Sequence, residues 1–268
     1  MLPISKIVKC NARTALKNKW PQSIAVCLIL IGAIAFCAVF TETVITLFGD
    51  NMQNPIFRVM EIVATLLCIT IIVGLVEGCI RWFWFLMLGK EIGISEVFYY
   101  YSSLNLFFKP IILYAHLIVR TTLLGIVCFL PFIVMTVLQD ERFYGLIGNH
   151  PPIILPVLWP LYYLFLALGA VLFILVITKY ALSPAIMVIN EDINPVDAIS
   201  ISVTLSSGNR CSWFGLFFSF VGWVIISAFG VTLLYTLPFF LMSYATFVRF
   251  TVSNYRLECS YRTCEPLI

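Results

Sequence analysis

Charged side chains interrupt two of the apolar runs in this sequence. Glu77 and Arg81 lie one helical turn apart in GLVEGCIRWFWF, residues 74–85, and His116 and Arg120 show the same spacing in a later run. Glu77 and Arg120 each lie about 15 Å of helix from one end of their run, close to the middle of a hydrocarbon core about 30 Å thick. Ionisable residues at that depth are costly, and they mark ion or substrate paths or buried ion pairs.

The sequence therefore predicts an intramembrane polar cluster of Glu77, Arg81, His116 and Arg120. We expect Glu77 to be the counter-ion of Arg120, with Arg81 near His116 or extended toward the inner headgroups. A GxxxG notch at residues 74–78 would let another helix come close beside Glu77. The pair could serve a proton or substrate path, contact an anionic lipid headgroup, or fix the register of two helices, and we favour the last role.

Motifs of catalytic or metal sites are absent from the sequence. It has no HExxH, GxSxG or Walker loop, and its two His residues cannot build a multi-His centre. The adjacent Glu191 and Asp192 form an acidic turn of a kind that is usually solvated rather than metal-binding. We therefore expect no enzymatic activity, no cofactor and no metal, and we expect no binding to nucleic acid.

The composition predicts a helical integral membrane protein. Of the 268 residues, 62% are hydrophobic and only 11% are charged, whereas soluble domains carry about 25% charged residues. The mean hydropathy is +1.03, and the apolar residues form long blocks rather than the alternation of barrel strands. Four blocks are each long enough for one span, at residues 23–48, 60–88, 111–138 and 153–178.

The last apolar block, residues 213–253, is too long for one span and about right for two. We expect a turn at residues 230–236, with Pro238 near the start of the final helix. The fold class is then all-α, a polytopic membrane protein with six transmembrane helices. A re-entrant pair or one long broken helix is the alternative for this block.

The basic residues predict the orientation of the chain. Of the 16 Lys and Arg residues, all but Arg58, Arg120 and Arg142 fall on one side of the six-span arrangement. Positive charge is concentrated on the cytosolic side of membrane proteins, so we expect both termini to be cytosolic.

Amphipathic segments precede the first, third and fifth predicted spans, and we expect them to be interfacial helices on the cytosolic side. In the third, Asn194 is expected to be the N-cap, with Pro195 at the first helical position. The chain would be one membrane domain, either with ordinary amphipathic connectors or built from three related units, followed by a tail at residues 256–268. The three segments are residues 4–20, 94–109 and 193–209, and the units are residues 1–89, 90–189 and 190–255.

The first of these segments is strongly basic. Each basic residue near an anionic membrane surface contributes about 1 kcal/mol of attraction, so the segment is expected to bind the headgroups of anionic lipids. The predicted headgroup-binding residues are Lys6, Lys9, Arg13, Lys17 and Lys19.

ARTALKNKWPQSI (12–24) resembles the start of a bacterial family of integral membrane proteins known as domain of unknown function 975. Members of that family carry Ala-Arg, Leu-Lys and Trp before the first span. The similarity returns at residues 198–248, in a Ser-rich amphipathic helix followed by Ser219, Phe220, Gly222, Trp223 and Pro238. The middle of the chain, residues 88–178, matches the family only in hydropathy.

The resemblance implies a multi-pass protein of the bacterial plasma membrane. The family is also distantly similar to the membrane domain of some glycerophosphodiester phosphodiesterases, which implies a link to lipids but supplies no active-site residue. We expect a non-enzymatic protein that binds anionic lipid or supports a membrane complex, with a protein partner or a second copy as further candidates. The alternative is a small transporter or channel that uses Glu77 and Arg120.

Overall fold

The structure is a computed structural model that describes residues 4–48, 55–139, 159–227, 230 and 232–263. These ranges are helical and contain no strand. Five helices are long and apolar enough to cross a membrane, which agrees with a multi-pass protein. They are α2 (Trp20–Phe48), α3 (Pro55–Met87), α4 (Leu104–Gln139), α6 (Trp159–Ile177) with its continuation to residue 189, and α10 (Leu233–Thr263).

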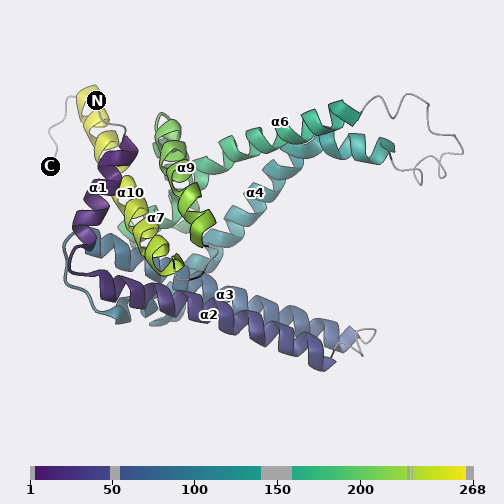
Figure 1. The fold of residues 1–268 in the computed structure, drawn as a ribbon, viewed down its shortest axis with the longest axis horizontal. Coiled ribbons are helices and arrows are strands. Elements are labelled where there is room, and N and C mark those ends of the chain that lie inside the picture. Colours follow the sequence, from purple (N-terminus) through teal and green to yellow (C-terminus); the bar gives the residue numbers. More distant parts are fainter. Residues whose placement is uncertain (1–3, 49–54, 140–158, 228–229, 231, 264–268) are drawn as a thin grey trace, which may run out of the picture.

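Two long hairpins form arms that extend from a common centre (Figure 1). Helices α2 and α3 run side by side in one arm, and α4 and α6 pair in the other. Both arms expose large apolar side chains, such as Phe36, Leu66 and Val127. Since a water-exposed surface of this kind would be unstable, these side chains are suited to contact lipid.

The buried core lies where the arms meet, and we call this region the hub. Its centre is the C-terminal part of α3, where Trp82 and Phe83 are buried next to one another. Short connecting elements pack around it, so much of the tertiary packing comes from segments between the long helices. These elements are η2 (Ile94–Tyr101), η4 (Thr178–Tyr180), α7 (Ser183–Ile189) and α8 (Pro195–Ser206).

The N-terminal helix α1 (Ile4–Leu16) packs along α10 and also contacts α9 (Arg210–Ile226). The predicted amphipathic helix is thus present, but its apolar residues Val8, Ala12 and Leu16 are buried against protein. Figure 1 shows α1, α9 and α10 grouped on the side of the hub away from the tips of the two arms.

The other two connecting segments match their predictions to different degrees. Asn194 caps α8 by accepting a hydrogen bond from the backbone N–H of Val196, and Pro195 is the first helical residue, as predicted. The segment at 94–109 is not one helix, because the 3₁₀ helix η2 ends at Tyr101 and α4 begins at Leu104. Residues 104–109 of that segment therefore belong to the long helix α4.

The last apolar block folds as two helices, α9 and α10, joined through Gly230, which has a φ of 72°. Helix α9 has 17 residues, fewer than the roughly 20 that a span needs. Pro238 lies in the second turn of α10 rather than at its start. The prediction of six spans is not confirmed over the described residues, and the predicted outer loop near Arg142 lies outside them.

Candidate functional site

Arg81 is the centre of a charged cluster that links segments far apart in the sequence, and we call it the Arg81 clamp. Its Nε donates to Glu96 Oε2 at 3.1 Å, and its Nη1 donates to Glu191 Oε1 at 2.5 Å. The guanidinium Cζ lies 3.6 Å from the ring centroid of Tyr99, whose hydroxyl donates to Glu191 Oε2 at 2.8 Å. Lys109 Nζ donates to the backbone carbonyl of Glu191.

The clamp stabilises the charged form of Glu191 and the neutral form of Tyr99. Arg81 holds the pKa of the Glu191 carboxyl below its ordinary value, chiefly through their hydrogen bond. Burial raises the pKa of Tyr99, and its hydrogen bond to Glu191 adds to this. The sequence predicts Glu191 only as part of a solvated acidic turn, and it assigns no role to Glu96. The signal for both was an acidic residue in a connecting segment near the inner end of α3.

Glu77, one turn before Arg81, is completely buried. Within the described part of the chain it forms no ion pair, and its carboxylate oxygens accept no hydrogen bond of good geometry, although the Tyr114 hydroxyl lies close enough to bond with it. The hydroxyl groups of Tyr100, Tyr114 and Tyr244 are near enough to interact with it electrostatically. Tyrosine hydroxyl groups from three elements thus lie around Glu77.

The predicted intramembrane cluster is not assembled as expected. Arg120 is half-buried on α4 and forms no ion pair with Glu77, and His116 on the same helix is exposed. Arg81 instead binds the connecting segments through the two carboxylates of the clamp. The ion pair expected between Glu77 and Arg120 is thus absent, although the four residues do lie on the neighbouring helices α3 and α4.

The glycine notch beside Glu77 does accept a close neighbour. A Cβ added to Gly78 would overlap the backbone carbonyl of Val97, and one added to Gly74 would lie 2.7 Å from the Tyr101 hydroxyl oxygen. The neighbour is η2 rather than the next long helix. The notch therefore seats the 3₁₀ segment that brings Glu96 and Tyr99 to Arg81.

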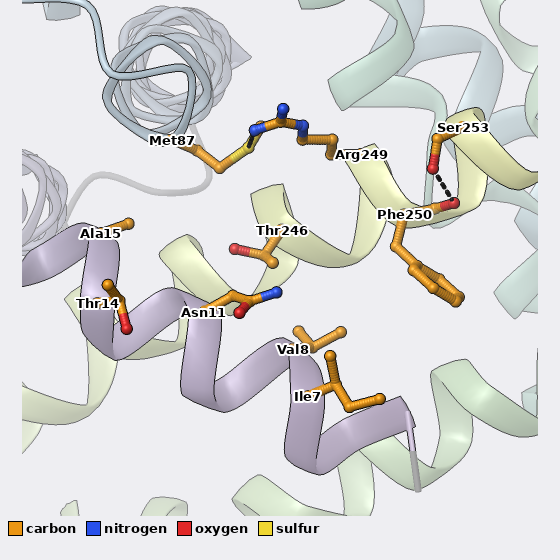
Figure 2. A pocket seen from close by; sticks show the side chains of 10 residues that line it. All are labelled: Ile7, Val8, Asn11, Thr14, Ala15, Met87, Thr246, Arg249, Phe250 and Ser253. Atoms are coloured by element: carbon orange, nitrogen blue, oxygen red, sulfur yellow. Dashed lines mark hydrogen bonds between the residues drawn. The ribbon is translucent and has the colours of Figure 1, made fainter. Parts of the chain in front are cut away.

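A groove between α1 and α10 opens near the end of α3 and has a volume of about 530 Å³. Figure 2 shows polar Asn11 and Thr246 facing each other across it, with Arg249 at its edge. The Arg249 Nη1 atom lies 3.5 Å from Met87 Sδ, and its side chain is exposed. The remaining lining residues are Ile7, Val8, Thr14, Ala15, Phe250 and Ser253.

The predicted headgroup-binding residues of α1 divide into two groups. Lys9 Nζ donates to the backbone carbonyl of Ser219 at 3.0 Å, and burial lowers the pKa of Lys9, with the charge of Arg13 adding to this effect. Lys9 and Arg13 also lie over aromatic rings of α9 and α10. Lys6 and Lys17 are exposed, and Lys19 is half-buried.

No metal centre is evident in the described ranges, where no three His, Cys, Asp or Glu side chains lie close enough together to hold an ion. The chain matches one protein family, described as "Protein of unknown function (DUF975)", over residues 3–254. No curated protein and no solved structure matches it.

Proposed function

We propose that this chain, which belongs to that family of unknown function, is a non-enzymatic membrane protein that binds one anionic lipid. The headgroup would lie in the groove between α1 and α10, where the Arg249 guanidinium stands beside hydroxyl and amide groups. Apolar Ile7, Met87 and Phe250 line the same groove and suit the first carbons of the acyl chains. The proposal rests on this groove, in which a polar and cationic surface adjoins an apolar one.

The charge around the groove supports an anionic ligand. Helix α1 contains no acidic residue, and its Lys6 and Arg13 are exposed, as is Lys17 directly after it. Such a surface attracts the anionic lipids of an inner leaflet. The distant similarity to membrane domains of glycerophosphodiester phosphodiesterases, which implies a link to lipids, remains a prediction, as does location in a bacterial plasma membrane.

A second part of the proposal concerns topology, with both termini on the cytosolic side. The distribution of Lys and Arg supports this orientation. The two arms would cross the membrane, while α9 and α10 would form an inner hairpin alongside α1, as in the re-entrant alternative for residues 213–253. Contact of α10 with the basic amphipathic helix α1 supports this arrangement over six spans.

The transporter alternative receives less support from the same residues. A transporter would need a water path to Glu77, and this side chain is completely buried.

A scaffold role with a partner or a second copy also stays a prediction. The small residues Gly215 and Gly222 on α9 have nothing within 4 Å of an added Cβ among the described atoms.

Native mass spectrometry of the protein extracted from its own membrane tests lipid binding. We expect one class of anionic lipid in a fixed ratio, with occupancy reduced about tenfold by Arg249→Gln, because a charge-assisted hydrogen bond contributes about 1.5–3 kcal/mol. Lys90→Gln is the matched control, since Lys90 is an exposed cation that does not line the groove. Equal retention in both variants, or no anionic lipid in the wild type, would refute the proposal.

A further inference from the structure

Glu77 has no role in the proposed lipid site, yet it is the most completely enclosed ionisable side chain of α3. Its exposure is zero, and neither carboxylate oxygen has a hydrogen bond of good geometry among the described residues, although the Tyr114 hydroxyl is close enough to form one. An isolated ionised carboxylate in such surroundings would lose its hydration with no compensation. The charge state of Glu77 therefore depends on which groups face it.

Among the described residues, no element that packs around this part of α3 presents an unpaired cation to Glu77. The titratable groups nearest to Glu77 are tyrosines, Tyr100 from η2, Tyr114 from α4 and Tyr244 from α10. Helix α7 contains no titratable residue, and Cys27 is the group that α2 brings close to Cys79 on this part of α3.

The nearby cations are bound to other partners. Arg81 holds Glu96 and Glu191, and Arg120 forms no ion pair with Glu77. On α1, Lys9 lies on the Phe220 ring and Arg13 on the Phe239 ring. No positive charge in the described part of the hub is thus placed to stabilise a Glu77 carboxylate.

Among the three tyrosines, Tyr114 can either donate to Glu77 or accept from it, whereas Tyr244 favours the neutral acid. The Tyr244 hydroxyl donates to the backbone carbonyl of Ala181 at 2.8 Å, so its single hydrogen is already used. Toward Glu77 this hydroxyl can only accept a hydrogen bond. A carboxylic acid can donate that bond, whereas a carboxylate cannot.

We propose that Glu77 is a proton-binding site, where the closed hub holds the side chain as an uncharged carboxylic acid among three tyrosine hydroxyls. An opening of the hub that admits water would let this acid release its proton. The hub would then carry a new negative charge and could close again only after taking the proton back. This inference does not depend on lipid binding, because none of these residues lines the groove between α1 and α10.

Infrared difference spectroscopy at neutral pH tests the proposal directly. The protein is held in a detergent without ester groups, so that lipid carbonyls do not overlap the band of a protonated carboxyl. We expect that band in the wild type and its loss in Glu77→Gln. Glu61→Gln is the matched control on the same helix, because Glu61 is not fully buried, and this variant should keep the band.

Hydrogen exchange adds the coupling to hub opening. In D₂O the Glu77 band should shift slowly, at the rate at which the hub opens, and faster in Arg81→Gln. The melting temperature of Glu77→Gln should stay close to that of the wild type, since Gln resembles the neutral acid. Absence of the band at neutral pH would overturn the proposal. A strongly destabilised Glu77→Gln whose stability is restored by Arg120→Gln would also overturn it, in favour of an ion pair.

Discussion

Arg81 shows why a span can hold a guanidinium close to one of its ends. Two carboxylates come to it from segments 15 and 110 residues away, and the ring of Tyr99 covers its face. Removing one member of such a buried pair leaves the other charge without compensation. The clamp thus ties η2 and the turn after α7 to the core of the hub.

Glu191 gives the clamp a pH dependence with a definite sign. Its folded-state pKa is lowered by Arg81, so its contribution to stability is present above the ordinary Glu pKa and is lost as pH falls through the folded-state value. Since its side chain is 44% exposed, we expect Glu191→Gln to lower the free energy of unfolding by about 1 kcal/mol at pH 7. Melting temperatures measured from pH 7 to acid check this, and the difference between the two proteins should shrink on acidification.

The neighbouring Asp192 is the control for this prediction. It is exposed and forms no ion pair within the described part of the chain. Asp192→Asn should therefore leave the melting temperature unchanged at every pH. A constant effect of Glu191→Gln across the pH range would show that Glu191 acts through packing rather than through its charge.

At the scale of elements, the position of η2 depends on its close contact with α3 at Gly78. The carbonyl of Val97 sits where a side chain at Gly78 would be. Gly78→Ala must push η2 away from α3, and overpacking of this kind costs about 1–3 kcal/mol. Thermal unfolding should show this loss, together with faster proteolysis between α3 and α4.

Gly222→Ala is a suitable comparison, because an added Cβ there meets nothing within 4 Å. Alanine has the higher helix propensity, so this variant should be as stable as the wild type or more so. If both glycine variants lose the same stability, the close approach of η2 to Gly78 is not what limits substitution.

The elements differ in how far the sequence could predict them. Helix α8 was predicted with its cap because Asn194 and Pro195 act locally. The 3₁₀ form of η2 was not, because it depends on contacts with distant residues. Val97 packs on Gly78, and the Tyr101 hydroxyl donates to the carbonyl of Ile71. Hydropathy shows none of these contacts.

For the whole molecule, hydropathy predicted the helices of both arms but not which faces meet in the hub. Glu77 faces Tyr114 on α4 rather than Arg120. These two positions on α4 are six residues apart, which is about 240° around a helix and about 9 Å along it. Helices α3 and α4 do adjoin, whereas the rotation of α4 is set by packing that the sequence pattern does not contain.

The packing of α1 along α10 constrains how the whole chain crosses a membrane. Asn11 and Ser253 line the same groove, so α1 and the later part of α10 lie together. Trp20 at the start of α2 stacks on Tyr235 at the start of α10, with ring centroids 4.8 Å apart. Tyr235 and Ser253 of α10 thus lie close to α1 or to the turn that follows it. The exposed Lys6 and Lys17 in this region favour a position at the membrane interface.

This geometry predicts that the turn between α9 and α10 is on the cytosolic side. Single-cysteine proteins carrying Cys10, Thr232→Cys or Thr46→Cys would be treated with a membrane-impermeant maleimide in right-side-out and inverted vesicles. We expect Cys10 and Thr232→Cys to react only in inverted vesicles, and Thr46→Cys, near the tip of the first arm, only in right-side-out ones. Reaction of Thr232→Cys from the outside, with Cys10 still reacting from the inside, would instead support six spans, since α9 and α10 would then both cross.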